Sequence, residues 1–159
     1  MAQEESSSEC VDGVNLKMEG IKRKFRKGTI VEVRSDEEGY KGSWYTVKIV
    51  EILENDNVLV EYQTLKTDDE TEFLKEEKDA SDIRPCPFVV QHAYPYVLGE
   101  RVDAWYNDGW WVGCIYKILH CSKYTVFFAM SNELLEFEHS ELRPHLEWIG
   151  GKWIAALKA

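Results

Sequence analysis

Residues 102–115 read Val102-Asp103-Ala104-Trp105-Tyr106-Asn107-Asp108-Gly109-Trp110-Trp111-Val112-Gly113-Cys114-Ile115, and the chain carries an earlier version of this stretch. The earlier version starts as Val31-Glu32-Val33-Arg34 and, after an acidic loop, continues as Gly42-Ser43-Trp44-Tyr45-Thr46-Val47-Lys48-Ile49. Three further matches keep the same order: Gly28 with Gly99, Val58-Leu59-Val60-Glu61-Tyr62 with Tyr124-Thr125-Val126-Phe127-Phe128, and Asp82-Ile83-Arg84-Pro85 with Glu141-Leu142-Arg143-Pro144. Such self-similarity predicts two copies of one small fold.

The spacing of the matched residues separates strands from loops. Tyr62 follows Tyr45 by 17 positions, and Phe128 follows Trp111 by the same 17. The length differences fall in the polar segments 34–44 and 62–84, which are longer than their counterparts 105–110 and 128–143. Because surface loops accept insertions and packed strands resist them, this distribution is typical of two copies of a β-structure.

Alternating apolar positions indicate five short strands in each copy. We expect them near 29–34, 44–53, 57–63, 71–76 and 81–84, and again near 100–105, 110–119, 123–129, 134–138 and 141–144. The polar run Glu54-Asn55-Asp56-Asn57 lies between two long alternating segments and signals a hairpin. Short, bent strands at this density predict an all-β chain of two small five-stranded antiparallel barrels packed in tandem.

These elements divide the chain into five parts. Residues 1–24 are largely polar, without periodicity and expected to be disordered. The two barrels occupy 25–85 and 96–146. A linker at 86–95 separates them, since Pro85-Cys86-Pro87 cannot continue a strand interior. A C-terminal tail covers 147–159, and in it residues 148–158 have helical character, interrupted by Gly150-Gly151.

The charge is negative and unevenly distributed. The formal net charge is −10, and residues 28–87 hold sixteen Asp and Glu against seven Lys and Arg. Seven of these acidic residues lie in two loops, Asp36-Glu37-Glu38 and Asp68-Asp69-Glu70-Thr71-Glu72. An acidic surface repels nucleic-acid phosphates and attracts basic peptides, although acid also keeps an aromatic-rich protein soluble. The basic run Lys22-Arg23-Lys24-Phe25-Arg26-Lys27 fits a localisation signal, a phosphate contact or a solvated lead-in to the first strand.

Residues for catalysis or metal binding are not arranged for either task. The four cysteines form no CxxC pair, and the four histidines complete no metal-ligand spacing. There is no Ser/His/Asp order with triad geometry and no phosphate-binding glycine loop. No secretory segment precedes the cysteines, and no apolar run approaches the ~20 residues that span a bilayer. We therefore expect no enzyme, no cofactor, no metal, no membrane insertion and a reducing intracellular compartment.

The run Gly109-Trp110-Trp111-Val112-Gly113-Cys114-Ile115, followed by a strand ending in Phe127-Phe128 and by Leu142-Arg143-Pro144, resembles the Agenet domain, the plant branch of the Tudor royal family. The resemblance covers 25–85 and 96–146. It implies Tudor-like (SH3-like) barrels, and the tandem is similar to plant heterochromatin readers with Agenet domains. The implied partner is the tail of histone three carrying a heterochromatic methyl-lysine, most directly dimethyl-lysine. The implied location is the nucleus, and we expect a monomer.

A methylated lysine keeps its charge but loses hydration and N–H donors, so aromatic faces enclose it, with about 0.5–2 kcal/mol for each good cation–π contact. Tudor-type barrels hold such a cage at one mouth. Carried over to the first repeat, this implies a cage of Tyr40, Trp44, Tyr45 and Tyr62, with Asp69 where a fourth wall would lie. In the second repeat it implies a candidate pocket of Trp105, Tyr106, Trp111 and Phe128. The first repeat is preferred for its tyrosine hydroxyls and acidic loops.

Each aromatic residue also has a structural alternative. Tyr62 and Phe128 fit core positions, Trp44 and Trp110 fit a contact between the repeats, and Tyr40 fits a loop tip. The acidic residues are expected to hold unmodified basic residues of the peptide, and they are Asp36, Glu37, Glu38, Asp68 and Asp69.

Two other functions stay open. One is RNA binding through exposed aromatics, which the negative charge disfavours and the basic run favours. The other is a scaffold that binds methyl-arginine or unmodified basic peptides.

Overall fold

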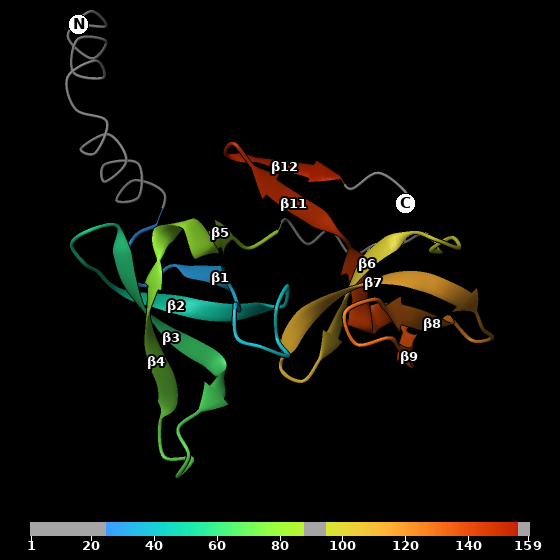
Figure 1. Cartoon of the computed structure of the whole chain (residues 1–159), viewed down its shortest axis with the longest axis horizontal. Coiled ribbons are helices and arrows are strands. Elements are labelled where there is room, and N and C mark those ends of the chain that lie inside the picture. Colours follow the sequence, from blue (N-terminus) through green and yellow to red (C-terminus); the bar gives the residue numbers. More distant parts are fainter. Residues whose placement is uncertain (1–24, 88–94, 156–159) are drawn as a thin grey trace, which may run out of the picture. The chain divides into compact units, whose positions relative to one another are not determined.

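The computed structural model describes residues 25–87 and 95–155, and within them the chain is all-β, with two short 3₁₀ turns and antiparallel strand pairs (Figure 1). The described residues divide into a first unit, residues 25–33 and 46–85, and a second unit, residues 34–45, 86–87 and 95–155. The segment 34–45 comes from the first sequence repeat, so the second unit includes the acidic loop of that repeat. The expected disordered segment 1–24, part of the linker and the last four residues lie outside the described residues. No helix in the described ranges is long and apolar enough to cross a membrane.

The first unit holds the five strands expected of the first repeat. They pair in the order β5-β1-β2-β3-β4. Their bounds are β1 (Ile30–Arg34), β2 (Trp44–Ile52), β3 (Asn57–Lys66), β4 (Phe73–Asp79) and β5 (Ile83–Pro85), with a 3₁₀ turn at Ala80–Asp82. The first two residues of β2, Trp44 and Tyr45, belong to the second unit.

The second unit repeats this order as β10-β6-β7-β8-β9. Its strands are β6 (Arg101–Tyr106), β7 (Gly109–Ile118), β8 (Lys123–Phe128), β9 (Glu133–Glu138) and β10 (Leu142–Pro144), with a 3₁₀ turn at His139–Glu141. The expected all-β class and antiparallel strands are confirmed in both units.

The helical character expected for residues 148–158 is wrong for the described part of that segment. Strands β11 (Leu146–Ile149) and β12 (Lys152–Ala155) form an antiparallel hairpin instead. Gly150 and Gly151 both have positive φ, 59° and 78°, and close the turn between them. Trp148 lies directly opposite Trp153, with ring centroids 5.2 Å apart, and such a cross-strand aromatic pair stabilises a hairpin.

The repeat is visible in details of the backbone. The pairing of β2 with β3 shifts register at Ile49/Glu51, and that of β7 with β8 shifts at the matching place, Ile115/Lys117. The hairpin turns after these bulges also correspond. Two consecutive residues have positive φ in each, at Asn55-Asp56 and Cys121-Ser122. Matched irregularities of this kind show that the two copies share one backbone plan, since bulges and turns fix strand register.

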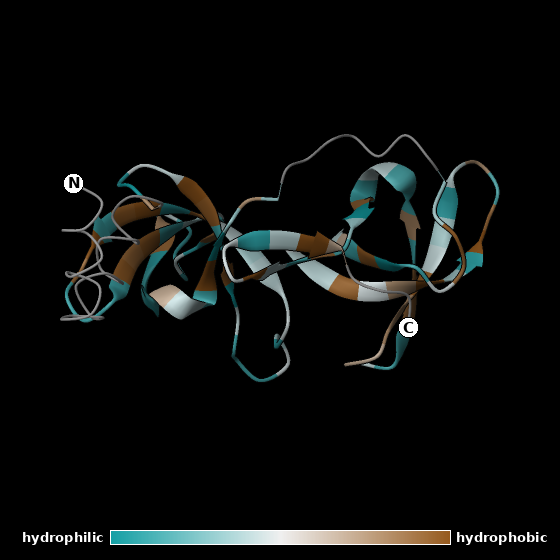
Figure 2. Cartoon of the chain, turned by 90° about the horizontal axis from the view of Figure 1, so that it is seen from above, coloured by the Kyte–Doolittle hydropathy of each residue, from teal (hydrophilic) through white to brown (hydrophobic). Residues whose placement is uncertain are grey.

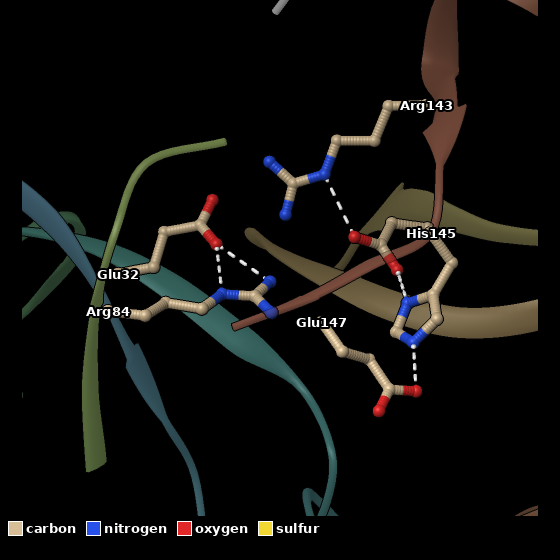
Figure 3. A network of polar contacts seen from close by, with 6 residues as sticks. Glu32, Arg84, Arg143, His145 and Glu147 are labelled. Atoms are coloured by element: carbon tan, nitrogen blue, oxygen red, sulfur yellow. Dashed lines mark hydrogen bonds and ion pairs between the residues drawn. The ribbon is translucent and has the colours of Figure 1, made fainter. Parts of the chain in front are cut away.

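A buried acid–arginine pair joins β1 to β5 in the first unit and β6 to β10 in the second (Figure 3). In the first unit, Arg84 Nε and Nη2 lie 3.0 and 2.9 Å from Glu32 Oε1, and the two residues are direct strand partners. In the second unit, Arg143 Nε donates to Asp103 Oδ2 at 2.9 Å across the equivalent register. Asp103 also contacts His145 Nδ1 at 2.7 Å. Each pair neutralises charge that the fold has removed from water.

Hydrophobic and hydrophilic residues alternate along the strands (Figure 2). The buried apolar residues of the first unit are mainly aliphatic: Val31, Val33, Val47, Ile49, Val58 and Val60. The core of the second unit is richer in aromatic rings and comprises Tyr96, Val102, Ala104, Ile115, Tyr124, Val126, Phe128, Phe137 and Leu142, with Trp111 and Leu135 packed against it. The second unit therefore brings aromatic rings to the edge of its core.

Candidate functional site

The second unit contains a cavity of about 400 Å³ whose lining includes four aromatic side chains. Its lining residues are Gly39, Tyr40, Lys41, Gly42, Tyr106, Asn107, Trp111, Val112, Phe128, Met130, Ser131, Glu133 and Leu135. All of them belong to the second unit, because its boundary includes residues 34–45. Three of the four aromatics come from the second repeat and Tyr40 comes from the acidic loop between β1 and β2.

Each of the three aromatics of the second repeat lies on a strand. Tyr106 ends β6, Trp111 lies near the start of β7, and Phe128 ends β8. Between the first two, Asn107 and Asp108 form a tight turn with φ of 47° and 64°. Asn and Asp accept this left-handed conformation more readily than most residues. The turn is short enough to hold Tyr106 and Trp111 on adjacent strands at the same end of the barrel.

The aromatic rings meet at steep angles. Tyr106 and Trp111 are 6.4 Å apart between centroids with an interplanar angle of 74°. Tyr40 lies 5.9 Å from Trp111 at 47°. On the core side, Phe128 packs edge-to-face on Phe137 at 5.8 Å. Trp111 is thus flanked by two tyrosines on neighbouring walls, and such an arrangement presents several ring faces to a single small group.

Charged groups lie both in the lining and beside it. Lys41 and Glu133 contribute one positive and one negative side chain to the lining, and both are exposed. The loop that carries Tyr40 also holds the exposed acids Asp36, Glu37 and Glu38. Attraction for a cation therefore has two sources, the ring faces inside the cavity and the acidic loop outside it.

Two members of the cage expected in the first repeat do not line the cavity, although they belong to the same unit. Tyr45 is buried, and burial raises the pKa of its phenol above the ordinary value of 10.0. The ring fills the space above Gly109, where an added Cβ would lie 2.8 Å from Tyr45 Cε1. Trp44 pairs with Trp110 across the strands. Trp105, expected in the second-repeat pocket, packs on Trp110 at 5.2 Å and is also absent from the lining.

The fourth member of that cage, Tyr62, lies in the first unit. Its ring is buried, and its hydroxyl donates to Glu76 Oε1 at 2.9 Å. The acids Asp68 and Asp69 also belong to the first unit, at the tip of the β3–β4 hairpin. Hydrogen bonds from the Thr67 and Thr71 hydroxyls and the Thr71 N–H lower the pKa of Asp69 to about 2. Asp69 is therefore ionised at neutral pH and already engaged in shaping its turn.

Sequence reasoning missed the polar and flexible part of the lining. Asn107, Met130, Ser131 and Glu133 lie in or next to loops that flank matched strands. The sequence could have indicated these loops, because the β6–β7 and β8–β9 connections directly follow the aromatic residues that end β6 and β8. Within the described residues, no group of three or more His, Cys, Asp or Glu side chains is placed to hold a metal ion.

Comparison with known proteins identifies relatives of this chain. A family model of the Agenet domain matches residues 28–88. "Protein AGENET DOMAIN (AGD)-CONTAINING P1" of Arabidopsis thaliana is 44% identical over 98% of the chain, and "DUF724 domain-containing protein 3" of the same plant is 37% identical over 82%. The chain spans only 30% and 20% of the lengths of these relatives.

Two solved structures are similar over nearly their full length. The crystal structure of Arabidopsis thaliana AGDP1 AGD34 superimposes with a TM-score of 0.83 at 38% identity, covering 90% of this chain and 97% of that one. The crystal structure of the ADCP1 tandem Agenet domain 3-4 gives a TM-score of 0.79 at 35% identity, covering 91% and 96%. The similarity extends over both repeats, beyond the residues 28–88 that the family model matches.

Proposed function

Because this chain belongs to the Agenet domain family, we propose that it is a chromatin reader that binds the tail of histone three through a methylated lysine. The proposed site is the aromatic cavity of the second unit. The proposed action is binding rather than catalysis, and the proposed place of action is the nucleus, where this ligand occurs.

The observation that carries this proposal is the set of four aromatic side chains around one cavity: Tyr40, Tyr106, Trp111 and Phe128. A methylated ammonium is a cation with an apolar surface. Ring faces attract its charge and accept its methyl groups without demanding hydrogen bonds, at about 0.5–2 kcal/mol for each good contact. An unmodified ammonium would lose three strong hydrogen bonds to water on entering the same cavity, so the rings favour the methylated form.

The lining also supports a preference for dimethyl-lysine. Glu133 is the acidic side chain of the lining. A dimethylammonium keeps one N–H, which a carboxylate accepts in a charge-assisted hydrogen bond. A trimethylammonium has no N–H to donate and keeps only the Coulomb attraction. Glu133→Gln should therefore reduce the preference for dimethyl-lysine over trimethyl-lysine.

The remainder of a histone tail is basic, and the loop acids suit it. Asp36, Glu37 and Glu38 lie within four residues of Tyr40, so a peptide whose methyl-lysine enters the cavity passes near them. Exposed charge pairs contribute modestly to affinity, but they raise the association rate and weaken as salt is added. The same charges disfavour RNA, which is the alternative ligand.

Calorimetry with peptides of the histone-three tail tests the proposal. The peptides carry unmodified, dimethyl- or trimethyl-lysine at the heterochromatic position. Wild-type protein should bind the dimethyl peptide most tightly, and Trp111→Ala should lower that affinity roughly tenfold or more, as expected for a central aromatic anchor. Trp153→Ala is the matched control, because it makes the same change in the β11–β12 hairpin outside the lining.

The proposal is wrong if wild-type protein binds the three peptides equally, or binds RNA more tightly than any of them at physiological salt. Circular dichroism establishes that each variant is folded. A preference for methyl-arginine peptides over methyl-lysine peptides would keep the cavity as the site but change its ligand.

A further inference from the structure

Tyr40 differs from the other three aromatic residues of the cavity in how it is held. Tyr106, Trp111 and Phe128 lie on strands, whose hydrogen bonds fix their backbones. Tyr40 lies on a loop, is 45% exposed, and has glycines with positive φ on both sides, at Gly39 and Gly42. An aromatic side chain that lines the cavity contributes more to affinity when it is fixed before the ligand binds, because ordering it on binding costs free energy.

Ser43 supplies an anchor for this loop. Its side chain is fully buried at 0% exposure, and its hydroxyl donates to the carbonyl oxygen of Tyr40. Its backbone N–H donates to the same oxygen at 3.1 Å, and its own carbonyl accepts from Ser35 N at 3.0 Å. The hydroxyl and the backbone N–H of Ser43 therefore both donate to the carbonyl oxygen of Tyr40. The backbone bond between Ser35 and Ser43 closes the base of the loop.

Tyr45 is the neighbour that holds the Ser43 side chain. Its side chain forms a hydrogen bond with the Ser43 hydroxyl, and its ring is buried against Gly109. Burial raises the pKa of Tyr45, so the phenol keeps its proton at neutral pH. Because the Ser43 hydroxyl donates its proton to the Tyr40 carbonyl, its oxygen can accept from the Tyr45 phenol. The Tyr45 phenol, the Ser43 hydroxyl and the Tyr40 carbonyl thus form a chain of hydrogen bonds, called the relay below, that links the buried ring beside Gly109 to Tyr40 at the cavity.

We propose that Ser43 and Tyr45 are positioning residues that hold Tyr40 in place as a wall of the cavity. The proposal rests on the function proposed above for the same cavity. It gives Tyr45 a role different from the cage wall expected from the sequence, because it acts through Ser43 and not by contact with the ligand. The relay would also explain why a glycine stands at position 109, where any side chain would displace the Tyr45 ring.

The first test needs no ligand. In wild-type protein, nuclear Overhauser contacts should join the rings of Tyr40 and Trp111, whose centroids are 5.9 Å apart. Ser43→Ala and Tyr45→Phe should each weaken those contacts and leave the Tyr106–Trp111 contacts unchanged. Ser35→Ala is the matched control. It removes a serine hydroxyl from the same loop, one that accepts from Glu37 N. Unchanged Tyr40–Trp111 contacts in both Ser43→Ala and Tyr45→Phe would overturn the proposal.

The second test is a double-mutant cycle with the dimethyl and unmodified histone-three peptides. Ser43→Ala should reduce the preference for the dimethyl peptide by roughly three- to tenfold, because a loosened wall loses part of its cation–π contribution. In a Tyr40→Ala background the same change should have no further effect. A merely structural role would weaken both peptides equally and would add to the effect of Tyr40→Ala, and either result would overturn the proposal.

The two tests separate this inference from the proposed function. If wild-type protein shows no methyl preference, the proposed function fails, and the ring contacts still decide whether Ser43 and Tyr45 position Tyr40. If wild-type protein prefers the dimethyl peptide and Ser43→Ala keeps the full preference, the function stands and the positioning role fails.

Discussion

The two units share a frame and differ at the end of the barrel where the loops meet. Both have the same strand order, the same bulge after the same buried isoleucine, and a buried acid–arginine pair that joins β1 to β5 or β6 to β10. Trp111 and Phe128 of the second unit line a cavity. Their counterparts in the first repeat, Tyr45 and Tyr62, are buried and use their hydroxyls in hydrogen bonds, with Ser43 and Glu76.

This difference shows that matched sequence positions need not have matched roles. A tyrosine hydroxyl at a buried position must find a hydrogen-bond partner, and the partner fixes the ring as part of the structure. Phe128 has no polar atom, and it borders the cavity although it is as buried as Tyr62. The indole N–H of Trp111 is buried and has no hydrogen-bond partner within the described residues, so no side-chain hydrogen bond ties either ring into the fold. The hydroxyls that favoured the first repeat in the sequence are the groups that tie its aromatic rings into the fold.

The largest expected effect concerns the buried acid–arginine pair that both units share. Arg84→Leu leaves the buried carboxylate of Glu32 without its guanidinium, and this should lower the free energy of unfolding of the first unit by about 3–5 kcal/mol. Arg143→Leu should cost less in the second unit, because His145 still contacts Asp103. Urea unfolding with amide hydrogen exchange measures each unit separately. A larger loss of unfolding free energy in Arg143→Leu than in Arg84→Leu would contradict this prediction. The Glu32→Leu/Arg84→Leu double variant should recover most of the stability that Arg84→Leu loses.

A smaller effect is expected at a position where the packing of the two units differs. Gly113 of β7 occupies the position that Val47 holds in the first unit. An added Cβ at Gly113 would lie 2.4 Å from Val126 Cγ1 and 3.2 Å from the ring of Phe128. Gly113→Ala should therefore destabilise the second unit by about 1–3 kcal/mol through overpacking, and it should disturb the cavity through Phe128. Thermal unfolding and peptide affinity check both effects; an unchanged melting temperature would show that β8 has room to move.

The acidic residues of the two units should differ in their effect on binding. Reversing Asp36, Glu37 and Glu38 to lysine should weaken the dimethyl histone peptide roughly tenfold at low salt, and the loss should shrink as salt is added. Reversing Asp68 and Asp69 should change affinity less, because Asp69 is engaged in its own turn. Calorimetry at two salt concentrations measures both. A larger loss from the second pair would assign peptide contacts to the hairpin of the first unit.

The smallest expected effect is on alkaline stability. Burial raises the pKa of Tyr45, so this phenol ionises near its ordinary pKa of 10.0 in the unfolded chain and at a higher pH in the folded one. Its contribution to stability is therefore complete below pH 10 and decreases as the pH rises above that value. Tyr45→Phe should make the fall of melting temperature above pH 10 less steep than in wild type. Equal slopes would mean that the phenol is as accessible to water as in the unfolded chain.

Much of the fold could be predicted from the sequence, because strands and core obey local rules. Apolar alternation located all ten barrel strands to within a few residues, and the repeat showed that they form two similar sets. The C-terminal hairpin was wrongly expected to be helical, because Gly150-Gly151 was interpreted as an interruption of a helix. In the structure these glycines form a turn that lets Trp148 face Trp153.

The site was less predictable than the fold. The sequence grouped Tyr106, Trp111 and Phe128 with Trp105, which does not line the cavity, and placed Tyr40 in another group. Placing Tyr40 with the second unit depends on the path of the nine-residue connection between Arg34 and Trp44, which no periodicity specifies. The burial of Tyr45 depends equally on a contact with Gly109, which lies far away in the sequence.

We propose that the cavity of the second unit, and not the cage expected in the first repeat, receives the methylated lysine. The most direct test follows the indole N–H signal of Trp111 and the ring signals of Tyr62 by NMR during titration with the dimethyl histone-three peptide, with the unmodified peptide as control. We expect a large shift of the Trp111 signal with the dimethyl peptide, a much smaller one with the unmodified peptide, and none of the Tyr62 signals. A shift of Tyr62 with Trp111 unchanged would contradict it.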